Sequence, residues 1–119
     1  GQTFHVYVNP ERTVPEAAFA VHGLSDDFLR DKPVFAAVAD ALLRFIEGAR
    51  LVIHNAGFDM GFLNAELGRL GHPPLPMDRA VDTVALARRR FPGAPASLDA
   101  LCRRFGVDNS GRTLHGALL

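Results

Sequence analysis

The sequence has little cysteine, no excess of charge and no long apolar run, and each absence excludes a class of protein. Cys102 is the only cysteine, which rules out a disulfide within the chain and is compatible with a reducing compartment. No apolar run approaches the ~20 residues of a membrane span, and the sequence contains no signal peptide. We therefore expect a cytoplasmic protein without a membrane partner. Because the first residue is not Met, we also expect the chain to begin inside a longer product or after processing.

Charge alone does not identify a partner. The 13 basic and 13 acidic side chains give a formal net charge of zero, so no overall field attracts the chain to nucleic acid or to a membrane. A nucleic acid partner stays open, because bound metal ions can supply positive charge locally. The one concentrated basic run, Arg88 to Arg90, is either a solvated helix face or a phosphate contact.

What the sequence does contain is enough apolar material for one folded domain. Its length of 119 residues predicts a single domain over residues 1–119, and 48% of them are hydrophobic, which is sufficient for a core. Alternation over residues 3–8 predicts a strand, and residues 11–20, which contain Pro15, are expected to be irregular. Apolar residues at helical spacing and the N-cap residues Ser25 and Ser97 predict a helical turn after Ser25, helices over 31–48, 58–70, 82–90 and 97–105, and an apolar helical pattern over 114–119. Asp82 or Thr83 can cap the helix over 82–90. Cys102 fits the helix over 97–105 as a small buried residue rather than a nucleophile.

The central stretch, residues 51–63, combines a buried strand, a turn and the start of a helix. Leu51 to Ile53 form a short apolar run, and the turn His54 to Gly57 lets the backbone change direction. Asp59 then falls in the first turn of the helix, where a carboxylate suits the helix dipole. Ligands gather at the carboxyl ends of strands in α/β sheets, so Asp59 is well placed for a hard cation. The alternative is that Asp59 merely caps its helix.

Two short motifs in this chain resemble those of one nuclease family. The stretch His-Asn-Ala-Gly-Phe-Asp at 54–59 resembles the second motif of the DnaQ-like 3′–5′ exonucleases, and Leu-His-Gly-Ala-Leu-Leu at 114–119 resembles the third motif of the branch that uses histidine (DEDDh). Residues 4–10, 97–102 and 108–113 are similar to the epsilon proofreading subunits of bacterial DNA polymerase III. The resemblance covers essentially the whole chain, in order and at the family's spacing, and it favours a chemical role for Asp59.

The resemblance implies a fold, a chemistry and a set of residues. The implied fold is ribonuclease-H-like, a mixed sheet flanked by helices, and the implied chemistry uses two divalent metal ions (Mg²⁺ or Mn²⁺), four acidic residues and a histidine. Two cations ~4 Å apart can supply both a nucleophile at neutral pH and charge stabilisation on the phosphorus. By the same resemblance Asp59 is a catalytic metal ligand and His115 is the general base. The implied substrate-binding residues are softer assignments: His22, Gly23, His54, Asn55 and Phe58.

The chain departs from the family at both ends. The first motif, Asp-x-Glu, and the family's first two strands precede the start of the chain, and the last metal-binding aspartate falls at position 120, one past its end. Asp82, Asp99 and Asp108 do not stand where a substitute is expected. We therefore expect the interior portion of an exonuclease domain, truncated at both ends and lacking three of the five catalytic groups. We expect the isolated chain to hydrolyse DNA poorly.

The resemblance leaves three functions to distinguish. The first is a 3′–5′ exonuclease that acts on single-stranded or frayed 3′ DNA ends and proofreads for a replicative polymerase, with the polymerase III catalytic subunit as a partner. The second is a catalytically incompetent fragment or a polymerase-associated nucleic-acid-binding module. The third is another nuclease of the same fold that trims RNA or serves repair, against which the epsilon-like stretches argue.

Overall fold

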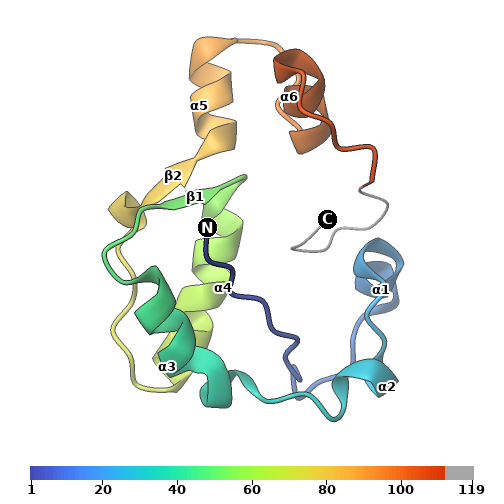
Figure 1. Ribbon diagram of the computed structural model, residues 1–119, viewed down its shortest axis with the longest axis vertical. Helices are drawn as coiled ribbons and strands as arrows, with labels where there is room; N and C mark the ends of the chain where they lie inside the picture. Colours follow the sequence, from blue (N-terminus) through green and yellow to red (C-terminus); the bar gives the residue numbers. More distant parts are fainter. Residues whose placement is uncertain (112–119) are drawn as a thin grey trace. The chain divides into compact units, whose positions relative to one another are not determined.

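The computed structural model describes residues 1–111 of the chain. These residues divide between two compact units, one made mainly of residues 1–45 and the other of residues 46–109. Figure 1 shows the elements of each unit, which we describe in turn. Within the described part of the chain, no helix combines the length and the apolar character that a membrane crossing requires.

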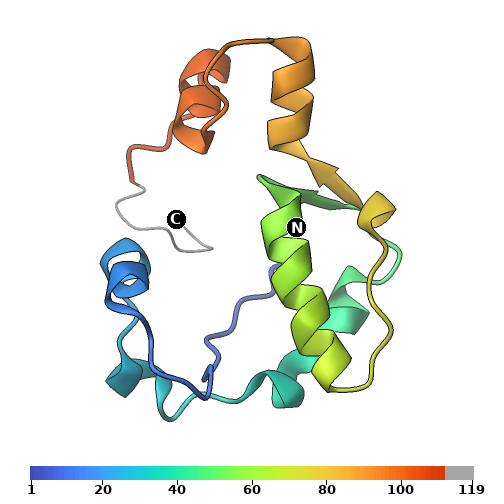
Figure 2. The ribbon, with the colours of Figure 1, turned by 180° about the vertical axis from the view of Figure 1, so that it is seen from behind.

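The second unit is built on two parallel strands. Strand β1 (Leu51–Ile53) pairs with β2 (Ala80–Asp82), and the register sets Ile53 beside Asp82. Helix α4 (Ala56–Arg69) connects the two strands and packs against both, as Figures 1 and 2 show from opposite sides. The result is a βαβ unit, so both strands end at the same edge of the sheet.

The core of this unit lies beneath α4. Ala56, Met60 and Leu67 are buried, and Met60 and Leu67 are fully enclosed. These positions recur at helical spacing, so they form one apolar stripe. The predicted strand β1 is confirmed, but the expectation that it is buried throughout is wrong, because Val52 is 68% exposed. Side chains alternate along a strand, and Val52 faces the side opposite to Leu51 and Ile53.

Three further elements complete the second unit. They are a short 3₁₀ turn, η1 (Met77–Arg79), before β2, helix α5 (Thr83–Arg90) and helix α6 (Leu98–Phe105). The predicted caps of both helices are confirmed: Asp82 accepts a hydrogen bond from the backbone of Val84, and Ser97 accepts one from Ala100. Cys102 is a free, partly buried residue of α6.

The first unit has one helix where the sequence predicted none, and it lacks a predicted strand. Residues 3–8 form no strand, and the nearest pairing is an isolated bridge between Asn9 and Val34. Alternation fits a strand, but a strand also needs a partner backbone, and among residues 1–111 only β1 and β2 pair as strands. Helix α1 (Glu16–His22) replaces the expected irregular segment. Pro15 stands just before its first residue, where the fixed φ of proline suits a helix start.

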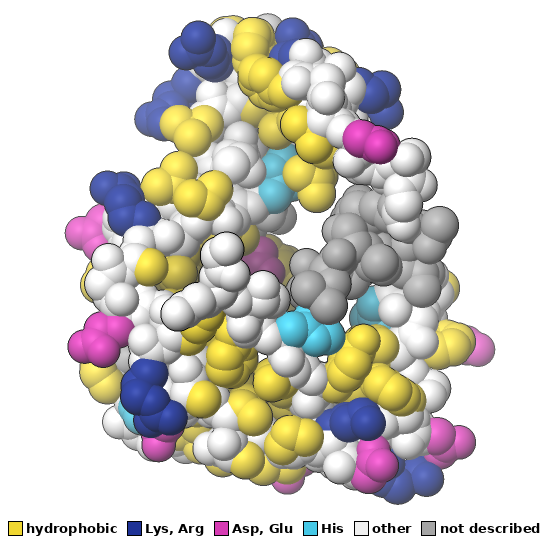
Figure 3. Space-filling model, in the orientation of Figure 1, with side chains coloured by type: hydrophobic (Ala, Val, Ile, Leu, Met, Phe, Trp, Pro, Cys, Tyr) yellow, Lys and Arg dark blue, Asp and Glu magenta, His cyan; other side chains and the backbone are white. Residues whose placement is uncertain are grey.

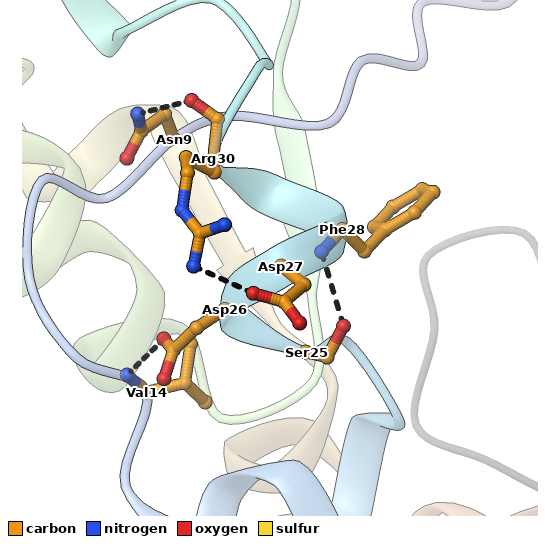
Figure 4. Close-up of polar contacts among 7 residues, drawn as sticks. All are labelled: Asn9, Val14, Ser25, Asp26, Asp27, Phe28 and Arg30. Atoms are coloured by element: carbon orange, nitrogen blue, oxygen red, sulfur yellow. Dashed lines mark hydrogen bonds and ion pairs between the residues drawn. The ribbon is translucent and has the colours of Figure 1, made fainter.

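Two more helices of this unit agree with the sequence. Helix α2 (Asp26–Leu29) follows the predicted cap, with Ser25 Oγ accepting from the backbone N–H of Phe28 at 3.1 Å. Helix α3 (Phe35–Ile46) lies within the helix predicted over residues 31–48 and begins later than expected. Polar contacts tie α2 to the preceding segment, since the Val14 N–H donates to Asp26 Oδ1 at 2.8 Å and the Asn9 amide donates to the carbonyl of Arg30 (Figure 4).

Candidate functional site

The junction between β1 and α4 carries four of the candidate residues. Strand β1 ends at Ile53, and Asn55 adopts the left-handed conformation with φ 67° and ψ 57°. Asn tolerates this conformation better than most residues with a side chain, and it turns the chain into α4 at once. The Asn55 side chain makes no capping hydrogen bond. Asp59 lies in the first turn of α4, and its side chain is exposed.

Two aromatic side chains flank Asp59 along α4. Phe58 is 62% exposed and Phe62 is 64% exposed, and their ring centroids are 4.9 Å apart with the planes tilted by 58°. Exposed aromatic rings are the surfaces on which nucleic acid bases stack. The pair therefore offers an apolar surface beside a carboxylate, although the sequence pointed only to Phe58.

Asp82, at the end of β2, supports this junction from the neighbouring strand. Its Oδ1 accepts from the Asn55 N–H at 3.0 Å and from the Val84 N–H at 2.9 Å. Burial raises the pKa of Asp82, but hydrogen bonds from backbone N–H groups at Val84, Asn55, Ala56 and Ala85 outweigh it and hold the pKa below its usual value of 3.8. The carboxylate is therefore ionised at neutral pH.

Thr83 holds the imidazole of His54 in the same way. His54 Nδ1 lies 2.9 Å from Thr83 Oγ1, and the Thr83 hydroxyl donates to the Ile53 carbonyl at 3.5 Å. Either group can donate in the contact between His54 and Thr83, because the role of Nδ1 depends on the tautomer of the ring. The contact involves Nδ1 only, so Nε2 stays available to a ligand.

Sequence reasoning recognised Asp82 and Thr83 only as possible caps of their own helix. It missed that both reach across to residues 54 and 55. The signal that could have shown this is the stretch Ala80–Asp82, which forms a second strand. A strand parallel to β1 ends at the same edge of the sheet, so its last residues lie near the turn after β1.

Two candidate residues belong to the first unit. His22 ends α1, and Gly23 follows it with φ 72°, a conformation that favours glycine. His22 Nδ1 accepts from the Leu24 N–H at 2.9 Å, so the neutral ring carries its proton on Nε2. His22 lines a hollow of about 330 Å³ in this unit, together with Tyr7 and Leu29 among others. The ring can thus donate one hydrogen bond to a ligand there.

The described residues include neither the predicted general base nor a complete metal site. His115 lies outside the described residues. Among residues 1–111, no group of three or more His, Cys, Asp or Glu side chains is arranged to hold a metal ion. Asp59 supplies one exposed carboxylate, which is the right donor for a hard cation but is too little for two. The described residues alone therefore do not fit a complete two-metal site.

The basic run lies on the exposed side of α5. Arg88, Arg89 and Arg90 are all exposed, and in Figure 3 basic side chains lie among apolar ones at the end of the unit that carries α5 and α6. A hollow of about 420 Å³ between these two helices has apolar walls, including Leu101 and Phe105, and contains none of the predicted site residues. The exposure agrees with a solvated face and leaves a phosphate contact open.

Comparison with known proteins identifies the family. Residues 1–119 match the RNase_T family, described as exonuclease. The DNA polymerase III subunit epsilon of Salmonella typhimurium (strain LT2) is 55% identical over 123 residues, covering 100% of this chain and 50% of that protein. The epsilon subunit of Rickettsia felis is 53% identical over 121 residues, covering 99% of this chain and 53% of that protein. The chain thus spans about half the length of these relatives.

A solved structure supports the same assignment. Exonuclease X, in complex with 5′ overhanging duplex DNA, superposes with a TM-score of 0.59 at 28% identity, over 85% of this chain and 53% of that one. The α/β fold with its small parallel sheet is therefore that of a ribonuclease-H-like exonuclease. With the match over its whole length, this chain belongs to the exonuclease family.

Proposed function

We propose that this chain is part of a 3′–5′ exonuclease that hydrolyses 3′-terminal phosphodiester bonds of DNA and proofreads for a replicative polymerase. One observation carries the proposal. In a chain that matches the exonuclease family throughout, Asp59 presents an exposed carboxylate at the start of α4, just beyond the carboxyl end of a parallel strand. This is the edge of an α/β sheet at which ligands bind.

The proposed cofactor is a pair of divalent metal ions, Mg²⁺ or Mn²⁺. Bound carboxylate-held cations of this kind provide charge stabilisation and a nucleophile at neutral pH. Asp59 would hold one of them, and the remaining ligands would come from outside the described residues. The chain matches only about half the length of its relatives, which is compatible with ligands elsewhere in a longer protein.

The other candidate residues receive roles that their contacts allow. We assign His115 as the general base, acting on the attacking water. Phe58 would stack against a base, and Nε2 of His54 would form a hydrogen bond with the substrate. His22, as an Nε2–H donor beside Gly23, would contact the 3′-terminal nucleotide. The backbone turn at Asn55 would keep His54 and Phe58 at the edge of the sheet.

The proposed substrate is a single-stranded or frayed 3′ end of DNA, and the proposed partner is the catalytic subunit of polymerase III. The relatives are named as subunits of that polymerase, and the solved neighbour is bound to overhanging duplex DNA. Replication proteins of bacteria work in the cytoplasm, which is the location we propose. The competing function is a polymerase-associated module that binds nucleic acid without cutting it.

The decisive experiment uses the gene product that carries this sequence at the length of its relatives. Release of nucleoside monophosphates from 3′-labelled single-stranded DNA is measured with Mn²⁺ for the parent, Asp59→Ala and Glu66→Ala. Loss of a metal-held carboxylate removes several kcal/mol of transition-state stabilisation, so Asp59→Ala should cut turnover at least about 1,000-fold. Glu66→Ala is the control, because Glu66 lies on the same helix and pairs only with Arg69 among the contacts of its side chain that the structure gives.

Four outcomes would contradict the proposal or one of its parts. DNA binding without hydrolysis by the parent would favour the binding module. Robust cleavage by Asp59→Ala would remove Asp59 from the metal site. Robust Asp59-dependent cleavage by the isolated 119-residue chain would show that the missing groups are not needed. For His115→Ala, a fall in turnover of less than about tenfold would be too small for a general base.

A further inference from the structure

We propose that Asp82 is a positioning residue of the nuclease site: its carboxylate fixes the backbone at Asn55 and thereby sets where Asp59 stands in the first turn of α4. The inference rests on the proposed function, since it assigns Asp82 a task in that site. Asp82 itself is not expected to bind metal. It acts through the backbone of the neighbouring junction.

The first step is that α4 lacks a cap of its own. The first N–H groups of a helix have no partner within the helix, and a side chain at the N-cap usually accepts from one of them. The Asn55 side chain makes no such bond, and its backbone is held in the left-handed region. The start of α4 is therefore not fixed by the side chain of its own N-cap residue.

The second step is that Asp82 supplies this group. The strand register sets Asp82 beside Ile53, the last residue of β1, so its carboxylate reaches the turn that follows. Oδ1 lies 3.0 Å from the Asn55 nitrogen and 2.9 Å from the Val84 nitrogen. One ionised carboxylate thus joins the starts of α4 and α5, and charged acceptors make the stronger hydrogen bonds.

The third step connects Asn55 to Asp59. Asn55 is the residue directly before α4, and Asp59 lies in the first turn of that helix, so the backbone at Asn55 sets the direction in which the turn begins. A shift at Asn55 rotates or tilts this turn and moves the Asp59 carboxylate with it. In catalysis a displacement of about 1 Å can cost on the order of 100-fold in rate. Partners that orient metal ligands typically contribute about 10- to 100-fold in metal affinity or activity.

The contact between Thr83 and His54 supports the same picture from the adjacent residue. Thr83 follows Asp82 directly, and its hydroxyl fixes the His54 ring at 2.9 Å. Residues 82 and 83 thus hold residues 55 and 54, respectively, and both contacts run from the end of β2 to the end of β1. Neither contact belongs to the cap of α5, which is the hydrogen bond from the Val84 N–H to Asp82.

The test separates positioning from helix capping with four variants of the full-length gene product. Asp82→Ala removes both contacts, and Asp82→Asn keeps an oxygen acceptor of the same reach. Asp82→Ser keeps a good cap for α5, but its shorter side chain withdraws from Asn55. Ser97→Ala is the matched control, because it removes a cap from α6 in the same unit without touching residues 54–59.

Two readouts are measured well below the unfolding temperature. The Mn²⁺ concentration for half-maximal activity should rise about 10- to 100-fold in Asp82→Ala and Asp82→Ser, should return to within about threefold of the parent in Asp82→Asn, and should not change in Ser97→Ala. Hydrogen exchange of the backbone amides over residues 54–58 should speed up in the same two variants only. The KM for DNA should change less than the metal dependence.

The outcomes distinguish failure of this inference from failure of the proposed function. If the parent cleaves DNA and Asp59→Ala does not, but Asp82→Ser behaves like Ser97→Ala in both readouts, the positioning role is wrong and the nuclease stands. If the parent has no nuclease activity, the proposed function fails and the site role fails with it, while the exchange data still report whether Asp82 holds the turn.

Discussion

The two strand-to-helix junctions of the second unit differ in how the start of the helix is held. At the β2–α5 junction, the last residue of the strand is also the cap of the helix: Asp82 accepts from Val84, and no connecting residue intervenes. At the β1–α4 junction, two residues intervene, Asn55 is left-handed and no side chain of the junction caps the helix. The first junction is locally complete, whereas the second draws a hydrogen bond from the first.

The difference follows from what each junction presents to solvent. The start of α4 exposes Phe58 and Asp59, which are the groups suited to a substrate and a cation. A residue that capped its own helix there would have its oxygen engaged with the backbone. Placing the cap on the neighbouring strand leaves the exposed groups free and still satisfies the backbone. The comparison suggests a rule: a helix start without a side-chain cap of its own can mark the junction at which a functional site is proposed.

The largest effect on stability should come from the residues that hold α4 in place. Met60→Ala should lower the free energy of unfolding by about 2–5 kcal/mol, because Met60 is fully enclosed and truncation leaves a cavity. Leu86→Ala on α5 should cost less than about 1.5 kcal/mol, since that side chain is already 43% exposed. Urea-induced unfolding measures both. Equal losses would show that the two helices do not differ in how they are held.

Much of this comparison was visible in the sequence, but its central contact was not. The apolar run before His54 predicted β1, and Asp82 was recognised as a possible helix cap. Each of these signals is contained in a few consecutive residues. The hydrogen bond between Asp82 and Asn55 joins positions 27 residues apart and depends on strand register, which no local pattern specifies. The prediction of a strand over residues 3–8 was wrong for the same reason: apolar and polar residues alternate there, but a strand also requires a partner strand.

The site was predictable to a similar extent. The motif at 54–59 located Asp59, and the structure places it in the first turn of a helix as expected. The exposure of Phe62 and the ring contact of His54 with Thr83 were not predictable, because they depend on how α4 and the strand ends pack. The roles assigned to the site residues all stay predictions: Asp59, His115, His22, Gly23, His54, Asn55 and Phe58.

A smaller effect tests the left-handed turn at Asn55, which leaves the β1–α4 junction without a cap of its own. Asn55→Ala should cost about 1–2 kcal/mol, because a Cβ without a polar group is strained at φ 67°, whereas Asn55→Gly should cost little or nothing from this source. Unfolding of both variants measures the backbone term. Nuclease activity of Asn55→Gly then tests the side chain alone: full activity would remove Asn55 from the list of substrate contacts.

The smallest effect is electrostatic and appears only in acid. The folded pKa of Asp82 lies below its usual 3.8, so the ionised form stabilises the fold above that pH, and this contribution is lost as the pH falls through the folded pKa. The parent should therefore lose more stability between about pH 5 and pH 2 than Asp82→Asn, whose amide does not titrate. Ser97→Ala provides the contrast, because a hydroxyl cap is neutral and its removal should lower stability equally across this range without changing the pH dependence. If the stability of Asp82→Asn falls in acid as steeply as that of the parent, ionisation of Asp82 does not stabilise the fold. The hydrogen bonds of Asp82 at the two junctions would then not lower its pKa.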